Sequence, residues 1–162
     1  MTHLALPRIR VLIATGARGV DSDLSFLSHW RGPLDLVARM MLAAIFLNEG
    51  WSKIVNYSTV EDYMRANGVD AHLLPLVILV ELGGGVLVLA GFKTRWAALA
   101  LSTFCVLTAL LFHFSADQTI DFQKNIAMSG GFLALAVHGA GPWSLDRWRA
   151  HARLRGNVNR TA

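Results

Sequence analysis

The chain of 162 residues is poor in cysteine, with Cys105 as its only one. A single cysteine excludes an intramolecular disulfide and a C-x-x-C dithiol pair, so the chain cannot carry out dithiol chemistry alone. The Cys/His set of a zinc site is also missing, and we predict no metal site. The sequence has neither a haem-attachment C-x-x-C-H motif nor a dinucleotide-binding glycine fingerprint. No redox cofactor is therefore evident from the sequence.

Charged residues are scarce too, at 16% of the chain against roughly 25% in soluble domains. Hydrophobic residues make up 54%, although only 9% of residues are aromatic. Long apolar runs contain few of these charged residues, a pattern that is typical of a membrane protein. The net charge is +4, and the basic residues lie at the ends of these runs. We therefore interpret the positive charge as a signal for the orientation of the chain in the membrane. We expect the lipid bilayer, and no nucleic acid, as a partner.

Four stretches are apolar and long enough to cross a bilayer core of ~30 Å as helices of ~20 residues. They are residues 35–55, 71–92, 96–114 and 124–143. Alternation of period two is absent from them, which argues against a membrane β-barrel. The sequence thus predicts an all-α integral membrane protein with a bundle of four transmembrane helices.

Lysine and arginine are distributed unevenly around these stretches. Eleven lie in the two terminal tails and in the loop between the second and third stretches, against Arg65 and Lys124 on the other side. Because cytoplasmic loops carry the excess of Lys and Arg, we predict that both termini are cytoplasmic. We divide the chain into an N-terminal tail (1–33), a four-helix membrane domain (34–148) and a basic C-terminal tail (149–162). The outer loop 56–70 is long enough for a small helix.

The first stretch keeps four charged residues, namely Asp35, Arg39, Glu49 and Lys53. At 100° per residue they fall within about 80° of arc on one helix face. A charge facing lipid at the bilayer centre costs roughly 2.5–3.5 kcal/mol, so this face must turn toward other helices or a water-filled cleft.

Polar residues in the other stretches offer partners, and depth along the helices places most of them in the outer half of the bilayer. We therefore predict a polar cavity inside the bundle that opens toward the outer face. Its candidate lining residues are Arg39, Glu49, Lys53, Glu81, His113, Lys124 and Asn125.

Purely structural explanations compete with this prediction. Glu49 and Lys53 have the spacing of a local i,i+4 salt bridge. Glu81 can act simply as the neutralising partner of Arg39 or Lys53, and His113 as a polar residue at the membrane interface.

Four segments occur in an order and at spacings that form a family pattern. They are ARMMLAAIFLNEGWSKI with Arg39, Gly50 and Lys53, ELGGGVLVLAG from Glu81, LLFHF with His113, and QKNIAMSGGFLALAVHGAGPWSLDRW. Residues 35–148 accordingly resemble the DoxX family of small bacterial membrane proteins. The resemblance implies a four-helix protein of the inner membrane. It also implies a role as an accessory or subunit of a membrane redox system, such as thiosulfate:quinone oxidoreductase or a complex that handles thiol or superoxide stress.

Three functions are consistent with these observations. In the first, a redox-associated subunit binds a quinone or similar small ligand in the outer-half cavity. There Glu81 and His113 would exchange protons with the head group, and Lys53 and Lys124 would stabilise negative charge. The alternative is a non-enzymatic anchor or assembly partner in a larger complex, and a small permease ranks third because no inverted repeat is apparent. The sequence leaves open whether the chain is catalytic, which redox-complex subunits it contacts and whether it forms a homo-oligomer.

Overall fold

Every regular element in residues 25–161 is helical, as the sequence predicts. The computed structural model describes the backbone of these residues and the side chains of residues 28–154. In chain order the elements are α2 (Ser25–Val55), α3 (Tyr57–Ala66), η1 (Ala71–Leu73), α4 (Leu74–Ala90), α5 (Thr94–Phe112), η2 (Ala116–Gln118), α6 (Thr119–His138) and α7 (Leu145–Thr161). The small helix expected in the loop 56–70 is α3.

Helix boundaries differ from the predicted ones at both ends of the bundle. The first helix begins at Ser25 instead of residue 35, so residues 25–33 of the predicted N-terminal tail are helical and Pro33 lies inside α2. The remainder of that tail, residues 1–24, lies outside the described residues. The fourth predicted span ends at His138 instead of residue 143, because Gly139 and Gly141 adopt positive φ angles that terminate a helix. Most of the predicted C-terminal tail belongs to α7.

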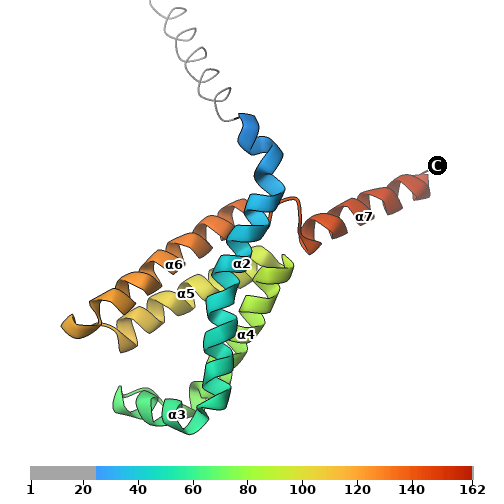
Figure 1. The fold of residues 1–162 in the computed structure, drawn as a ribbon. Helices are drawn as coiled ribbons and strands as arrows, with labels where there is room; N and C mark the ends of the chain where they lie inside the picture. Colours follow the sequence, from blue (N-terminus) through green and yellow to red (C-terminus); the bar gives the residue numbers. More distant parts are fainter. Residues whose placement is uncertain (1–24, 162) are drawn as a thin grey trace, which may run out of the picture.

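The long helices form two antiparallel pairs, α2 with α4 and α5 with α6. Figure 1 shows that the pairs approach one another at the end where α7 begins and diverge toward the end where α3 lies. We call these ends the α7 end and the α3 end. A stacked contact between Tyr63 and Phe112, with ring centroids 5.6 Å apart, connects α3 to the far end of α5.

The hydrophobic core lies where the two pairs meet. The Phe46 ring of α2 packs edge-on against Phe104 of α5 and Phe132 of α6, with centroids 6.3 and 5.3 Å away. Leu101 and Cys105 of α5 are fully buried beside them. This cluster fixes how the two pairs pack toward the α7 end.

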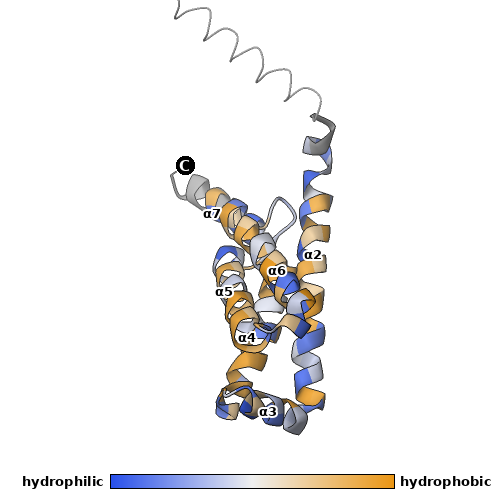
Figure 2. Cartoon of the chain, turned by 90° about the vertical axis from the view of Figure 1, so that its left-hand side faces the viewer, coloured by the Kyte–Doolittle hydropathy of each residue, from blue (hydrophilic) through white to orange (hydrophobic). Residues whose placement is uncertain are grey.

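Two helical segments are long and apolar enough to cross a membrane, Ala71–Ala90 and Thr94–Phe112. Only 22% and 33% of their most apolar windows are buried inside the protein, whereas the core helix of a soluble protein would be mostly buried. Figure 2 shows apolar residues along α4 and α5, and polar residues gathered at α3. Composition thus supports two of the four predicted spans, while α2 and α6, which carry more polar residues, remain predicted spans.

Candidate functional site

Three ionisable side chains meet between α2 and α4. The Lys53 Nζ atom lies 3.0 Å from Glu81 Oε1 and 3.4 Å from Glu49 Oε2. The Glu81 side chain is 5% exposed and that of Lys53 is 20% exposed, whereas the Glu49 side chain is 52% exposed. We call these residues the Lys53 cluster. It joins a buried carboxylate to a partly exposed one through a single ammonium group.

Glycines allow the two helices to approach closely at this cluster. A Cβ atom added at Gly50 would lie 2.7 Å from Leu82 Cγ and 3.3 Å from Glu81 Cβ. One added at Gly85 would lie 3.1 Å from Leu47 Cδ2. Small residues at such positions permit tight helix packing in a membrane, and here they bring Lys53 within reach of Glu81.

The Glu81 carboxylate is only half satisfied. Its Oε1 atom accepts a hydrogen bond from Lys53, while Oε2 is buried and has no partner among the described residues. A buried oxygen without a hydrogen bond costs about 1–3 kcal/mol, and more when it is charged. Oε2 is therefore a ready acceptor for a proton or a donor group.

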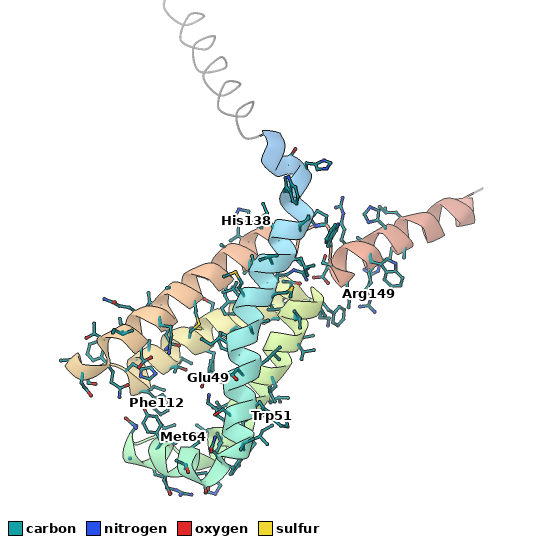
Figure 3. All side chains as sticks on the ribbon, viewed as in Figure 1. Glu49, Trp51, Met64, Phe112, His138 and Arg149 are labelled. Carbon is teal, nitrogen blue, oxygen red and sulfur yellow. The ribbon has the colours of Figure 1, made fainter. Side chains whose placement is uncertain are left out.

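The cluster adjoins the region where the two helix pairs diverge. In Figure 3, Glu49 lies on the side of α2 toward the α5–α6 pair. The core contacts of Phe46 lie one helical turn closer to the α7 end. The exposed part of the cluster thus lies on the side of α2 that faces the α5–α6 pair.

Arg39, another predicted cavity residue, lies away from this cluster at the α7 end. Its side chain is buried and donates hydrogen bonds to the carbonyl oxygens of Val88 and Leu89 at 3.4 and 3.2 Å, and to that of Trp143. These carbonyls belong to the last turn of α4 and to the α6–α7 loop. Arg39 thus joins three segments, because it donates from α2 to backbone carbonyls at the end of α4 and in the α6–α7 loop.

Gly91 makes room for this arginine. It ends α4 in the left-handed conformation with φ 67°, and a Cβ atom there would collide with the Arg39 guanidinium and with Ser144. Both the backbone angle and the available space therefore require glycine.

Asp146 caps α5 from a distant part of the chain. Its Oδ1 accepts from the Lys93 backbone N–H at 2.8 Å, and its Oδ2 accepts from the Thr94 backbone N–H at 3.0 Å and hydroxyl at 3.1 Å. The Asp146 backbone N–H donates to the Gly91 carbonyl at 2.9 Å. The segment GPWSLD thus stabilises the α4–α5 turn. Sequence reasoning singled out this segment but missed its role, because the capped helix begins 52 residues earlier.

The three remaining candidates lie on the α5–α6 pair and bond locally. His113 Nδ1 lies 2.5 Å from Gln118 Oε1, and exposed Lys124 lies 2.6 Å from Asp121 Oδ1. Asn125 is buried and donates to the Asp121 carbonyl. No hydrogen bond or ion pair in the described chain joins these three to the Lys53 cluster, so their place in one cavity remains a prediction.

Two shallow hollows are found elsewhere. One of about 400 Å³ lies at the α7 end between residues 28–33 and the loop at Pro142 and Trp143. The other, of about 220 Å³, lies beside His113 and the aromatic rings of Phe114 and Phe122. Within residues 28–154, no group of three His, Cys, Asp or Glu side chains has the arrangement of a metal site.

Helices with outward-facing apolar residues and a buried ion cluster are features of a helical membrane protein. A family model described as DoxX matches residues 34–114. Inner membrane protein YqjF of Escherichia coli (strain K12) is 47% identical over 115 residues, which cover 69% of this chain and 88% of that relative. Inner membrane protein YphA of the same organism is 33% identical over 127 residues, covering 72% and 91%. The chain belongs to the DoxX family, as its sequence motifs indicate, and no solved structure gives a significant match.

Proposed function

We propose that this chain is a multi-pass protein of the bacterial inner membrane, with α2, α4, α5 and α6 as its four spans. The names of both relatives place them in the inner membrane. At the α7 end, exposed basic residues are concentrated, namely Arg31, Lys93, Arg95, Arg147, Arg149 and Arg153. By the positive-inside rule this end and both termini lie in the cytoplasm, and α3 lies on the opposite side.

Within the membrane, the chain acts as a component of a redox system and binds the polar head group of a quinone or a similar small ligand. The observation that carries this proposal is the unpaired Oε2 atom of Glu81, buried next to Lys53. Ionisable groups inside a membrane are costly, which favours a function for them. A hydroxyl of a quinol could donate to Glu81 Oε2, and Lys53 could donate to a carbonyl oxygen of the oxidised ligand.

The chain's own part in the reaction is to bind the head group and to move protons. Glu81 accepts a proton from a ligand hydroxyl, and Lys53 stabilises the negative charge that remains on the ligand oxygen. The electrons pass to or from a redox centre on a partner subunit. Exposed Glu49 connects the buried pair to the space between the helix pairs, which gives the proton a route. His113, Lys124 and Asn125 remain candidates for the opposite wall of that space.

The proposal is tested by isolating the protein from its own membrane in lipid nanodiscs and measuring bound quinones by mass spectrometry. We expect quinone in stoichiometric amounts with the wild type, and a loss of at least tenfold with Glu81→Gln. Asp62→Asn is the matched control, because Asp62 forms an exposed ion pair with Arg65 on α3. A wild-type protein without quinone, or a Glu81→Gln variant that retains it fully, would refute quinone binding.

A second function, that of a non-enzymatic anchor for a larger complex, is favoured by the amount of apolar surface. Large apolar side chains are exposed along every long helix, and some of this surface can bind other membrane subunits instead of lipid. Crosslinking in native membranes distinguishes the two functions. A stable heteromeric complex that keeps its quinone-dependent redox activity with Glu81→Gln would support the anchor function. A complex that stays intact with Glu81→Gln but loses this redox activity would support the ligand site.

A further inference from the structure

One face of α2 carries a heptad-like seam of exposed residues. Its residues follow one another at alternating intervals of four and three, and we call them the α2 seam: Val37, Met41, Ala44, Asn48, Trp51 and Val55. They fall within about 80° of arc, opposite the face that buries Arg39, Ala43 and Phe46. All six are exposed, and the exposed fraction reaches 72% at Met41.

Asn48 is the anomaly in this otherwise apolar seam. Its amide is exposed and has no hydrogen-bond partner among the described residues. Thr103, an exposed polar residue in α5, instead donates to the Leu99 carbonyl of its own helix at 3.0 Å. An amide in hydrocarbon without a partner costs several kcal/mol, so a lipid-facing Asn48 would be strongly unfavourable.

Contacts between the helices show that Asn48 lies deep in the membrane. Its neighbours Leu47 and Gly50 pack against Gly85 and Leu82 of α4. Both α4 residues lie in the second half of the candidate span Ala71–Ala90. Asn48 is therefore about one helical turn (~5 Å) from the bilayer centre, within the hydrocarbon core of ~30 Å.

We propose that the partner of this seam is the α2 helix of a second copy of the same chain. Copies inserted with one orientation place their α2 helices parallel, and a two-fold axis along the membrane normal then sets residue 48 against residue 48. A side-chain amide has both donors and an acceptor, so two asparagines can satisfy one another. Seams with alternating spacings of three and four pack as parallel helix pairs, in which a single asparagine fixes the register.

The rest of the α2 seam suits the same partner. Ala44, one turn from Asn48, is small and lets two helices approach closely, as small residues do in membrane helix pairs. The basic side chains of α2 within the membrane, Arg39 and Lys53, turn toward α4, so they do not repel a second α2. The seam is also separate from the Lys53 cluster, and the dimer does not depend on the proposed ligand site.

Disulfide crosslinking tests this arrangement in intact membranes. Cys105, the only native cysteine and a buried one, is first replaced by Ser. We expect Ala44→Cys in this background to form a disulfide-linked dimer rapidly under mild oxidation. Leu79→Cys is the matched control, because Leu79 is 66% exposed on α4 and should not crosslink. Equal crosslinking at both sites, or adducts of residue 44 only with other proteins, would overturn the proposal.

The role of Asn48 is measured by diluting labelled protein in lipid and following dimerisation by energy transfer. Interhelical hydrogen bonds in model peptides predict that Asn48→Val weakens association by roughly 5- to 30-fold, while Asn48→Gln, which keeps the amide, retains most of it. Because Asn48 is exposed in the monomer and has no hydrogen-bond partner among the described residues, we expect the folding of each chain to be retained. A protein that stays monomeric at every dilution, or an Asn48→Val variant that associates like the wild type, would refute the amide pair.

Discussion

The strongest energetic prediction concerns the buried pair of Lys53 and Glu81. Lys53→Met would leave the Glu81 carboxylate, which is 5% exposed, without a cation, and breaking a buried pair in this way costs about 3–5 kcal/mol. Glu81→Gln should cost less, about 1–3 kcal/mol, because Lys53 keeps Glu49 as a partner. The double variant contains neither buried charge, so its loss should be about 1–2 kcal/mol. The coupling energy is then at least about 2 kcal/mol.

Reversible unfolding in mixed micelles, or steric trapping in bicelles, measures all four proteins. An ordinary interhelical hydrogen bond in a membrane couples its partners by only ~0.6 kcal/mol on average. The measured coupling energy therefore distinguishes a buried ion pair from an ordinary hydrogen bond. The matched control is Asp62 with Arg65 on α3, an exposed pair for which we expect about 0.2–1 kcal/mol. A Lys53–Glu81 coupling no larger than that control would show that the pair is not a buried ion pair.

Three further predictions concern the framework. Asp146→Ala should lower the free energy of unfolding by about 1–2 kcal/mol through loss of the cap on Thr94, and Asp146→Asn should restore part of it in the same assay. Gly84→Val should lower the free energy of unfolding by about 1–3 kcal/mol through overpacking, because a Cβ atom at this position would lie 2.8 Å from Leu101 of α5. Gly130→Ala is the control and should be neutral, because a Cβ atom there would have open space around it. The backbone N–H of His72 donates a hydrogen bond to the Asp70 carboxylate and holds the pKa of Asp70 below its usual value. That hydrogen bond is therefore intact at neutral pH and lost as pH falls through the lowered pKa, and amide exchange measured against pH should show it.

Local patterns were sufficient to predict α2, α4, α5 and α6, because apolar runs of membrane length are read directly from sequence. They did not predict α7, which covers most of the predicted C-terminal tail. The same patterns placed α3 in the loop 56–70. They failed at helix ends, where single backbone conformations decide. The fourth helix stops early because of Gly139 and Gly141. The first helix continues through Pro33, its ninth residue, although a proline in a helix interior removes a backbone hydrogen bond.

The candidate site was predictable only in part. The i,i+4 spacing identifies Glu49 with Lys53, and of the two cations named as partners for Glu81 the structure pairs it with Lys53. The bonds of Arg39 to backbone carbonyls of α4 could not be predicted from spacing, because they depend on how helices distant in sequence pack. The same limitation hid the Asp146 cap and the buried hydrogen bond between Ser102 and Ser129, which joins α5 to α6.

The bonds made by Arg39 and Asp146 have a mechanical consequence. They tie α2, α4, the start of α5, the α6–α7 loop and the start of α7 together at the α7 end. At the opposite end a ring contact between Tyr63 of α3 and Phe112 of α5 bridges the two pairs. Movement of one helix pair relative to the other should therefore be a rotation about the α7 end. Any displacement of one pair against the other therefore grows with distance from Arg39, and is greater beside Glu49 than at the Phe46 contacts.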